Sequence, residues 1–292
     1  MSTLPASIGL SISDKKCYYL IWVPSESGPM VIDYDSFKHE DNLIPFDYLS
    51  NKVKEHNVSP RFSISLNNNL VKYDYSESYG QSTVDSWNKN NFYDKNFRKF
   101  YYSYLYDNNK GTFSIHIPKT IKEDIVSQAK EYSYNLINLG VGIFSALDGV
   151  RSWFELAGLE KYIIIKFGRG RIIELLMIHG NQFSYYMTLK KQNSNFNIID
   201  FFGNNKDRKG ALKIIENIFS KELDSIKSKI FYYSVDGNKE DVEFLLNLKT
   251  DKIELINPLR KIVFDDSCVK KISDANGSAY SELGNLFRGV DV

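Results

Sequence analysis

The sequence predicts an α/β fold made of two similarly built lobes. Residues 7–37 read as a three-strand meander, and residues 162–189 read as a second one. In both halves the meander is followed by a helix, a strand and a further helix, as hydrophobic spacing changes between strand and helix periods. A chain of 292 residues is also long enough to form two domains.

The first half is expected to continue from its meander through short, alternating elements. The helix at residues 46–55 has Phe46, Leu49 and Val53 on one face. The other expected elements are strands at 61–66 and 70–75, a helix and loop at 76–96, strands at 100–106 and 113–118, a helix capped by Thr120, a strand at 136–139 and a helix at 143–154.

The second half is expected to follow the same order. After its meander come a loop with a short strand at 193–209, a helix at 211–228, a strand at 230–233, a helix at 242–248, a strand at 252–255 and a closing helix at 279–288.

Composition excludes several classes of protein. Thirty-seven basic and thirty-six acidic residues leave a formal charge of +1, without the basic excess that nucleic-acid binding requires, so nucleic acid is not an expected partner. No apolar stretch is long enough to span a membrane, and residues 1–10 lack the pattern of a signal peptide. The two cysteines, Cys17 and Cys268, form no CxxC pair, which fits a reducing cytoplasm.

Motifs for catalysis and metal binding are missing. The four histidines are scattered without the spacing of metal ligands, and neither a P-loop nor a Gly-x-Ser-x-Gly elbow occurs. We therefore predict no catalytic residue and no metal site.

Several short motifs, in order along nearly the whole chain, resemble the PilM-like proteins of type IV pilus assembly, which belong to the actin-like ATPase superfamily. They are Ile8–Asp14, Trp87 with the aromatic strand Tyr101–Tyr106, Ile117–Lys119, Ile163–Gly168, Ile253–Pro258 and Ala279–Gly289. The resemblance implies a two-lobed actin-like ATPase (ribonuclease H-like) fold. It implies a first lobe at 1–157 with a small α+β subdomain inserted at about 42–118. The second lobe would then span 158–292, and the closing helix at 279–288 would return to the first lobe.

The resemblance also implies two phosphate-binding hairpins, and the first departs from the family pattern. Ser11 stands where the family has an Asp, Ser13 stands at its Gly, and Asp14 and Lys15 replace a small, hydroxyl-rich turn. Ser13 and Lys15 could still contact a phosphate, but the acid expected to orient hydrated magnesium is missing.

The second hairpin has a cation in place of its acid. Lys166 occupies the position of the family's Asp, while Gly168 and Gly170 keep a permissive turn that carries Arg169 and Arg171. One reading is an anion held directly by Lys166, Arg169 and Arg171. The other is a solvated basic turn with no ligand.

A third turn, Ser234–Gly237, matches the family's adenosine-contacting turn. Gly237 keeps one of two expected glycines and follows Asp236, although Asp-Gly is also a common tight turn. These three loops are vestigial candidates for nucleotide binding, so ATP with magnesium is a doubtful ligand and little or no ATP hydrolysis is expected.

By resemblance, the protein is expected to be a cytoplasmic scaffold of an envelope-spanning pilus or secretion machine. It would bind the cytoplasmic tail of an inner-membrane PilN-like partner, and would thereby be peripheral to the inner membrane; other pilus-assembly proteins are further candidate partners. The alternatives are a nucleotide-dependent switch of the same fold, a filament-forming relative, and an unrelated α/β binding module.

Overall fold

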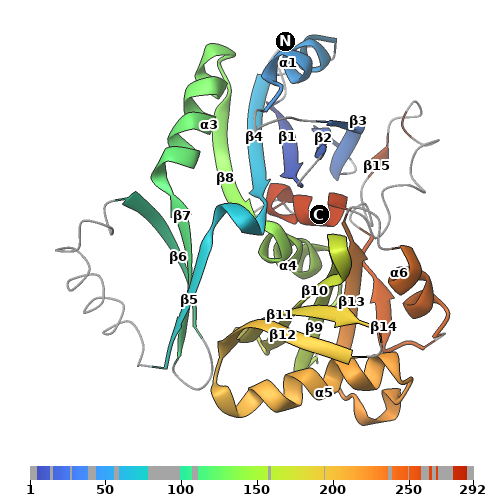
Figure 1. The fold of residues 1–292 in the computed structure, drawn as a ribbon. Coiled ribbons are helices and arrows are strands. Elements are labelled where there is room, and N and C mark those ends of the chain that lie inside the picture. The colour runs from blue at the N-terminus through green and yellow to red at the C-terminus, as the bar shows by residue number, and fades with distance from the viewer. Residues whose placement is uncertain are drawn as a thin grey trace. The chain divides into compact units, whose positions relative to one another are not determined.

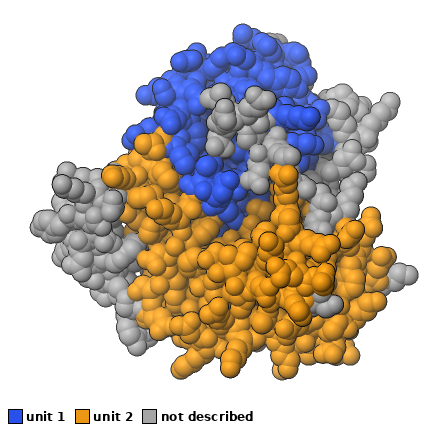
Figure 2. All heavy atoms as spheres, in the orientation of Figure 1, with its two compact units in different colours: residues 1–70, 121–155, 256–292 blue, residues 71–120, 156–255 orange. Residues whose placement is uncertain are grey.

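The computed structural model describes most of the chain in two compact units (Figure 2). Unit 1 comprises residues 1–70, 121–155 and 256–292, and unit 2 comprises residues 71–120 and 156–255. The described residues are 5–13, 16–26, 28–38, 44–55, 59–77, 99–106, 111–156, 159–193, 195–235, 239–248, 250–257, 263–264, 268 and 279–287. No described helix is long and apolar enough to cross a membrane.

The units are interleaved along the chain. Residues 71–120 interrupt unit 1 in sequence, and their contacts group them with residues 156–255. Residues 256–292 group with the amino-terminal segment of unit 1. Contacts alone do not define where a lobe begins, so the boundary expected at residues 157 and 158 stays a prediction.

Unit 1 is built on a six-stranded sheet in the order β15-β3-β2-β1-β4-β8 (Figure 1). Its strands are β1 (Pro5–Ile12), β2 (Lys16–Ser25), β3 (Gly28–Lys38), β4 (Ser59–Leu66), β8 (Asn135–Val141) and β15 (Val263–Phe264). β1, β2 and β3 are antiparallel, as the meander predicts, and β4 and β8 then join in parallel.

The two faces of strand β1 differ in the size of their side chains. Ile8 and Leu10 are buried on the face that also carries Phe62, which packs edge-on against Phe46 of helix α1 (Phe46–Glu55). Gly9 and Ser11 lie on the opposite face, because successive residues of a strand point to opposite sides. Small side chains on that face allow another element to approach the strands closely.

That element is the closing 3₁₀ helix η7 (Ala279–Phe287). A Cβ atom on Gly9 would lie only 2.7 Å from Leu286 of η7. Next to η7 lies α4 (Gly142–Trp153), and a Cβ atom on Gly284 would lie 2.3 Å from the backbone nitrogen of Gly149. Glycine is therefore required where these two helices meet.

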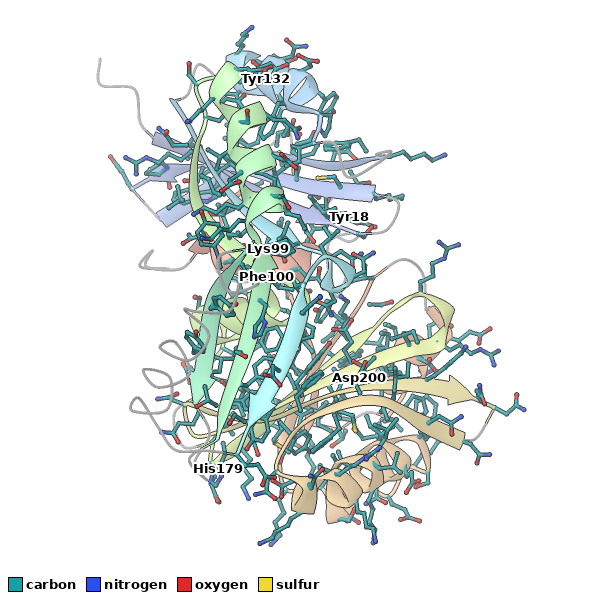
Figure 3. All side chains as sticks on the ribbon, turned by 60° about the vertical axis from the view of Figure 1, so that its left-hand side comes forward. Tyr18, Lys99, Phe100, Tyr132, His179 and Asp200 are labelled. Carbon is teal, nitrogen blue, oxygen red and sulfur yellow. The ribbon has the colours of Figure 1, made fainter. Side chains whose placement is uncertain are left out.

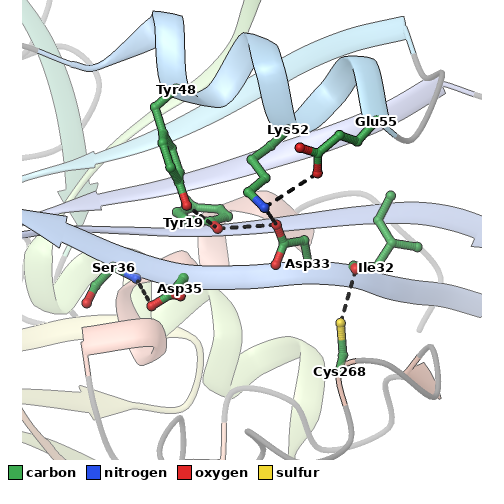
Figure 4. A network of polar contacts seen from close by, with 9 residues as sticks. All are labelled: Tyr19, Ile32, Asp33, Asp35, Ser36, Tyr48, Lys52, Glu55 and Cys268. Atoms are coloured by element: carbon green, nitrogen blue, oxygen red, sulfur yellow. Dashed lines mark hydrogen bonds and ion pairs between the residues drawn. The ribbon is translucent and has the colours of Figure 1, made fainter.

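Helix α1 is also held on the sheet by polar contacts (Figure 4). The Tyr19 hydroxyl donates to Asp33 at 3.2 Å and lies 3.3 Å from the Tyr48 hydroxyl, while Lys52 lies 3.7 Å from the same Asp33 carboxylate. Burial, together with the nearby hydroxyl and carboxylates, raises the pKa of Tyr19 well above its usual range. Tyr19 therefore stays a neutral donor that links β2 and β3 to α1.

Unit 2 has a six-stranded sheet in the order β12-β11-β10-β9-β13-β14. The strands are β9 (Lys161–Phe167), β10 (Ile172–His179), β11 (Gln182–Gln192), β12 (Asn195–Gly203), β13 (Lys229–Ser234) and β14 (Ile253–Leu255). As in unit 1, an antiparallel meander is continued by two parallel strands beyond its first strand. Helices α5 (Arg208–Phe219) and α6 (Lys239–Leu246) contribute Ile215 and Leu245 to the core on one face.

A separate three-stranded sheet, in the order β5-β7-β6, belongs to the same unit. Its strands are β5 (Lys72–Ser76), β6 (Phe100–Tyr106) and β7 (Thr112–Pro118), and Figure 3 labels Phe100 on β6. Phe113 of β7 stacks on Phe183 of β11 with ring centroids 4.6 Å apart, and Tyr73 of β5 meets Tyr186 edge-on at 5.2 Å. Aromatic contacts thus fix the small sheet to β11.

Three expectations about local structure were wrong. Residues 195–203 form one nine-residue strand rather than a loop with a short strand. The full strand was not predicted because a bulge at Ile199 interrupts the alternation of apolar and polar residues. The helix expected at 211–228 ends at Phe219, and Lys221 then takes a positive φ of 66°. Thr120 caps no helix, since α3 (Lys119–Glu131) already begins at Lys119.

The other elements agree with the sequence pattern to within a few residues, and the expected helix and loop at 76–96 lies largely outside the described residues. Short 3₁₀ turns complete the fold: η1 (Asn68–Leu70), η3 (Arg169–Arg171), η4 (Asn205–Asp207) and η5 (Leu223–Ser225).

Candidate functional site

The first candidate hairpin joins β1 to β2. The Ser13 hydroxyl donates to the Lys16 carbonyl at 3.0 Å and accepts from the Lys16 backbone N–H at 3.2 Å, so it closes the turn itself. Ser11 precedes Ser13 by two residues, near the end of β1, and is fully buried. Asp14 and Lys15 lie outside the described residues, and their role stays a prediction.

The acid missing from position 11 has a counterpart from another element. The Ser11 hydroxyl donates to Oε2 of Glu282, which lies on η7 and is itself buried. Ser11 and Glu282 are 271 residues apart in sequence, so no local pattern could have joined them. The structure therefore places a carboxylate beside the end of β1, although the strand itself carries only a hydroxyl there.

The second candidate hairpin joins β9 to β10 through η3. The Gly168 N–H donates to the Ile172 carbonyl at 2.8 Å, and Gly170 has a φ of 69°, a left-handed conformation that glycine adopts without strain. Arg169 and Arg171 are exposed, and neither forms an ion pair with another described residue. Two exposed arginines on a tight turn, neither of them paired with a described residue, fit either reading of this hairpin.

Lys166 differs from these arginines because it is buried and paired. Its ammonium lies 3.2 Å from Oε1 of Glu174, and both side chains are only 9% exposed. The two residues face each other directly in the β9–β10 register. A buried charge needs a partner of opposite sign, and Glu174 supplies it.

A tyrosine extends this pair across the sheet. The Tyr186 hydroxyl on β11 donates to Oε2 of Glu174 at 3.0 Å, and Thr188 donates to the Tyr186 oxygen at 3.4 Å. Burial and the Glu174 charge raise the pKa of Tyr186 well above its usual value of 10. The line Lys166–Glu174–Tyr186–Thr188 is therefore a satisfied polar network on three adjacent strands.

The third candidate turn begins beside the second hairpin. β13 runs parallel to β9, Ser234 pairs with Phe167, and the Val235 N–H donates to the Phe167 carbonyl at 2.8 Å. Asp236 and Gly237 follow, outside the described residues. The structure thus brings together the second hairpin and the start of the third turn at one end of the unit 2 sheet.

Sequence reasoning missed Glu174, Tyr186 and Glu282. A signal for the first existed: Lys166 is the only charge in the interior of β9, Glu174 is the only acid of β10, and they lie symmetrically about Gly170, the turn glycine. An antiparallel hairpin centred there must pair them. Whether Lys166, Arg169 and the turn glycines bind an anion stays a prediction.

Both six-stranded sheets repeat one plan, a meander continued by two parallel strands, with a candidate phosphate hairpin between the first two strands of each. This is the actin-like ATPase fold, and the predicted fold class is confirmed.

Among solved structures, this chain is similar to the following proteins. A chain described as the "PilM-PilN type IV pilus biogenesis complex" matches with a TM-score of 0.59 and 12% identity, over 97% of this chain and 98% of that one. A Bacteroides thetaiotaomicron protein with an actin-like ATPase fold matches with a TM-score of 0.45 and 12% identity, over 88% and 92%.

The cytoplasmic domain of EpsL, an inner-membrane component of the type II secretion system of Vibrio cholerae, matches with a TM-score of 0.44 and 9% identity, over 78% and 82%. Of these three matches, only the PilM–PilN chain has a TM-score above 0.5, so the similarity in fold is judged from that structure. No protein-family model and no curated protein matches the sequence.

Proposed function

We propose that the protein is a scaffold on the cytoplasmic side of an envelope-spanning pilus or secretion machine, where it binds the cytoplasmic tail of a PilN-like inner-membrane protein. One observation supports this function above the others. The fold matches that of a chain from a PilM–PilN complex, and the match covers 97% of this chain and 98% of that one.

We further propose that the nucleotide site is degenerate. Lys166 stands at the strand position where an acid is expected, and its charge is already neutralised by Glu174 rather than available to a phosphate. The same pairing engages the Glu174 carboxylate, which is therefore not free to orient hydrated Mg²⁺. Ser11 is engaged with Glu282 beneath the first hairpin. These contacts favour a scaffold over a nucleotide-dependent switch.

The proposal is tested by direct binding. A synthetic peptide of the cytoplasmic tail of the PilN-like protein encoded in the same genome is titrated against the purified protein by calorimetry, with a scrambled peptide as control. The expected result is saturable binding of the native peptide alone. Equal binding of both peptides, or of neither, would contradict the proposal.

Sedimentation at several protein concentrations separates this function from a filament-forming one. A scaffold is expected to sediment as a small species whose size changes little with concentration or with added ATP. Polymers that appear above a critical concentration would favour the filament.

A further inference from the structure

The small sheet of unit 2 is joined to the rest of that unit through side-chain contacts rather than through the backbone. Residues 71–120, which carry β5, β6 and β7, are flanked in sequence by residues 70 and 121, and both of these belong to unit 1. The six-stranded sheet of unit 2 begins only at residue 161, after the chain has passed through unit 1 again. The two sheets can therefore separate without a break in either strand ladder.

Aromatic rings supply the contact between the two sheets. On the small sheet the rings come from one face, which carries Tyr73 and Tyr75 of β5 and Phe113 of β7. On the six-stranded sheet they come from β11 and β12. Six described ring pairs have centroids 4.6–6.3 Å apart: Phe113–Phe183, Tyr73–Tyr186, Tyr73–Phe202, Phe113–Phe202, Phe113–Tyr186 and Tyr75–Phe183. Such pairs stabilise a contact that has no covalent link.

Tyr186 belongs both to this aromatic contact and to the polar network beneath it. Its ring meets Tyr73 and Phe113 edge-on, and its hydroxyl donates to Glu174 at 3.0 Å. The other carboxylate oxygen of Glu174 lies 3.2 Å from the Lys166 ammonium, so the acceptor is itself held in place. Because a satisfied buried network fixes the orientation of its members, the ion pair determines how the Tyr186 ring faces the small sheet.

The same ion pair lies at the base of the second hairpin. Lys166 of β9 and Glu174 of β10 face each other, and the turn with the exposed Arg169 and Arg171 closes between them. Packed side chains and hydrogen-bond networks carry coupling between distant parts of a protein. A shift of β9 against β10 therefore moves the acceptor of the Tyr186 hydroxyl, and with it the surface on which the small sheet docks.

We propose that the small sheet is a latch that docks on β11 and β12 or separates from them, and that Tyr186 couples this docking to the Lys166–Glu174 pair of the second hairpin. The structure shows the docked form. Tyr186 is a positioning residue in this device: without its bond to Glu174 the ring can turn, and Tyr73 and Phe113 lose the surface they pack against. This coupling is a property of the chain alone, so its test needs no partner and its failure would leave the proposed function standing.

Neighbouring tyrosines on β11 provide a matched pair of variants. Tyr186→Phe removes the hydroxyl that donates to Glu174 and keeps the ring. Tyr185→Phe makes the same change in a buried tyrosine on the opposite face, whose hydroxyl has no hydrogen-bond partner among the described residues.

The readout is native-state hydrogen exchange of amides in β5 and β7, compared with those in β9 and β10. We expect Tyr186→Phe to speed exchange in β5 and β7 about tenfold or more, because a hydrogen bond to a charged group contributes about that much. Exchange in β9 and β10 should rise less, since the latch opens before the unit unfolds. Tyr185→Phe should leave exchange in β5 and β7 unchanged.

Phe113→Leu completes a double-mutant cycle. It removes the ring that stacks on Phe183 and meets Tyr186, so it should also speed exchange in β5 and β7. Because the two changes weaken one shared contact, the double variant should speed exchange by less than the product of the single effects. The coupling is overturned if the two tyrosine variants exchange alike, if β9 and β10 respond as strongly as β5 and β7, or if the effects of Tyr186→Phe and Phe113→Leu simply multiply.

Discussion

The buried pair of Lys166 and Glu174 permits a sharp test of its structural role. Glu174→Leu would leave a buried ammonium without its counter-charge, at a cost of about 3–5 kcal/mol. Lys166→Met would leave the carboxylate instead, at a similar cost of about 3–5 kcal/mol. The double variant removes both charges and takes the Glu174 acceptor away from the Tyr186 hydroxyl, which costs about 1–3 kcal/mol.

The single costs therefore should not add. Their sum is about 6–10 kcal/mol against about 1–3 kcal/mol for the double variant, a coupling of at least about 3 kcal/mol. Native-state hydrogen exchange of amides in β9, β10 and β11 measures these free energies within unit 2. Additive costs, or a cost below about 1 kcal/mol for Glu174→Leu, would refute the reasoning.

A more exposed pair in the same sheet serves as the control. Lys229 lies 2.9 Å from Glu254, with side chains 23% and 34% exposed. Solvent screens such a pair, so Glu254→Leu is expected to cost no more than about 1 kcal/mol.

Three further predictions concern packing, pH and nucleotide. Gly284→Ala would put a Cβ atom 2.3 Å from the backbone of Gly149 and Ser145, and is expected to cost about 1–3 kcal/mol or more, measured by thermal unfolding through the fluorescence of the buried Trp153. Burial lowers the pKa of His116 below its ordinary 6.5, so on acidification the unfolded chain binds a proton before the folded one does. The free energy of unfolding should therefore be highest above about pH 7 and should fall as the pH drops through and below 6.5. Urea unfolding at several pH values measures this trend, which should be weaker in His116→Gln. Millimolar ATP with Mg²⁺ should leave the thermal midpoint unchanged, whereas a ligand at a hundredfold its Kd would add about 2.7 kcal/mol.

Each of these has an outcome that counts against it. Gly210→Ala is the packing control, because a Cβ atom there meets nothing within 4 Å; equal destabilisation by both alanines would show that close approach is not the cause. An unchanged pH dependence in His116→Gln would remove that histidine from the explanation. A clear rise of the midpoint with nucleotide would contradict a degenerate site and revive the switch.

The fold could be predicted from sequence because its strongest signals are local. The meanders show as alternation with polar turns, and helix α1 shows as the spacing of Phe46, Leu49 and Val53. Only a short strand was expected where β12 lies, because one bulged residue, Ile199, shifts the alternation by a position. A single inserted residue is enough to hide a strand from a period-two pattern.

The site was harder to predict because its contacts are not local. Ser11 could be singled out as a missing acid, yet its partner Glu282 comes from the other end of the chain. Lys166 had two readings, a cation that holds an anion and part of a solvated basic turn, and only the strand register shows that it is buried with Glu174 facing it. The exposed Arg169 and Arg171 keep both readings open until an anion is offered to the protein.

The position of η7 on the first strands bears on how the chain is made. Translation adds about 5–20 residues per second, so roughly 14–54 s separate the synthesis of Ser11 from that of Glu282, 271 residues later. Throughout that interval the face of the unit 1 sheet that η7 will cover stays open on the nascent chain. It carries Gly9, Ser11 and Ser63, but also Leu20 and Trp22 of β2, whose burial waits for later parts of the chain, whereas the face with Phe62 is covered by α1, made only seconds before β4. The nascent chain therefore has to keep these apolar side chains from associating with other chains until its carboxy-terminal segment is made.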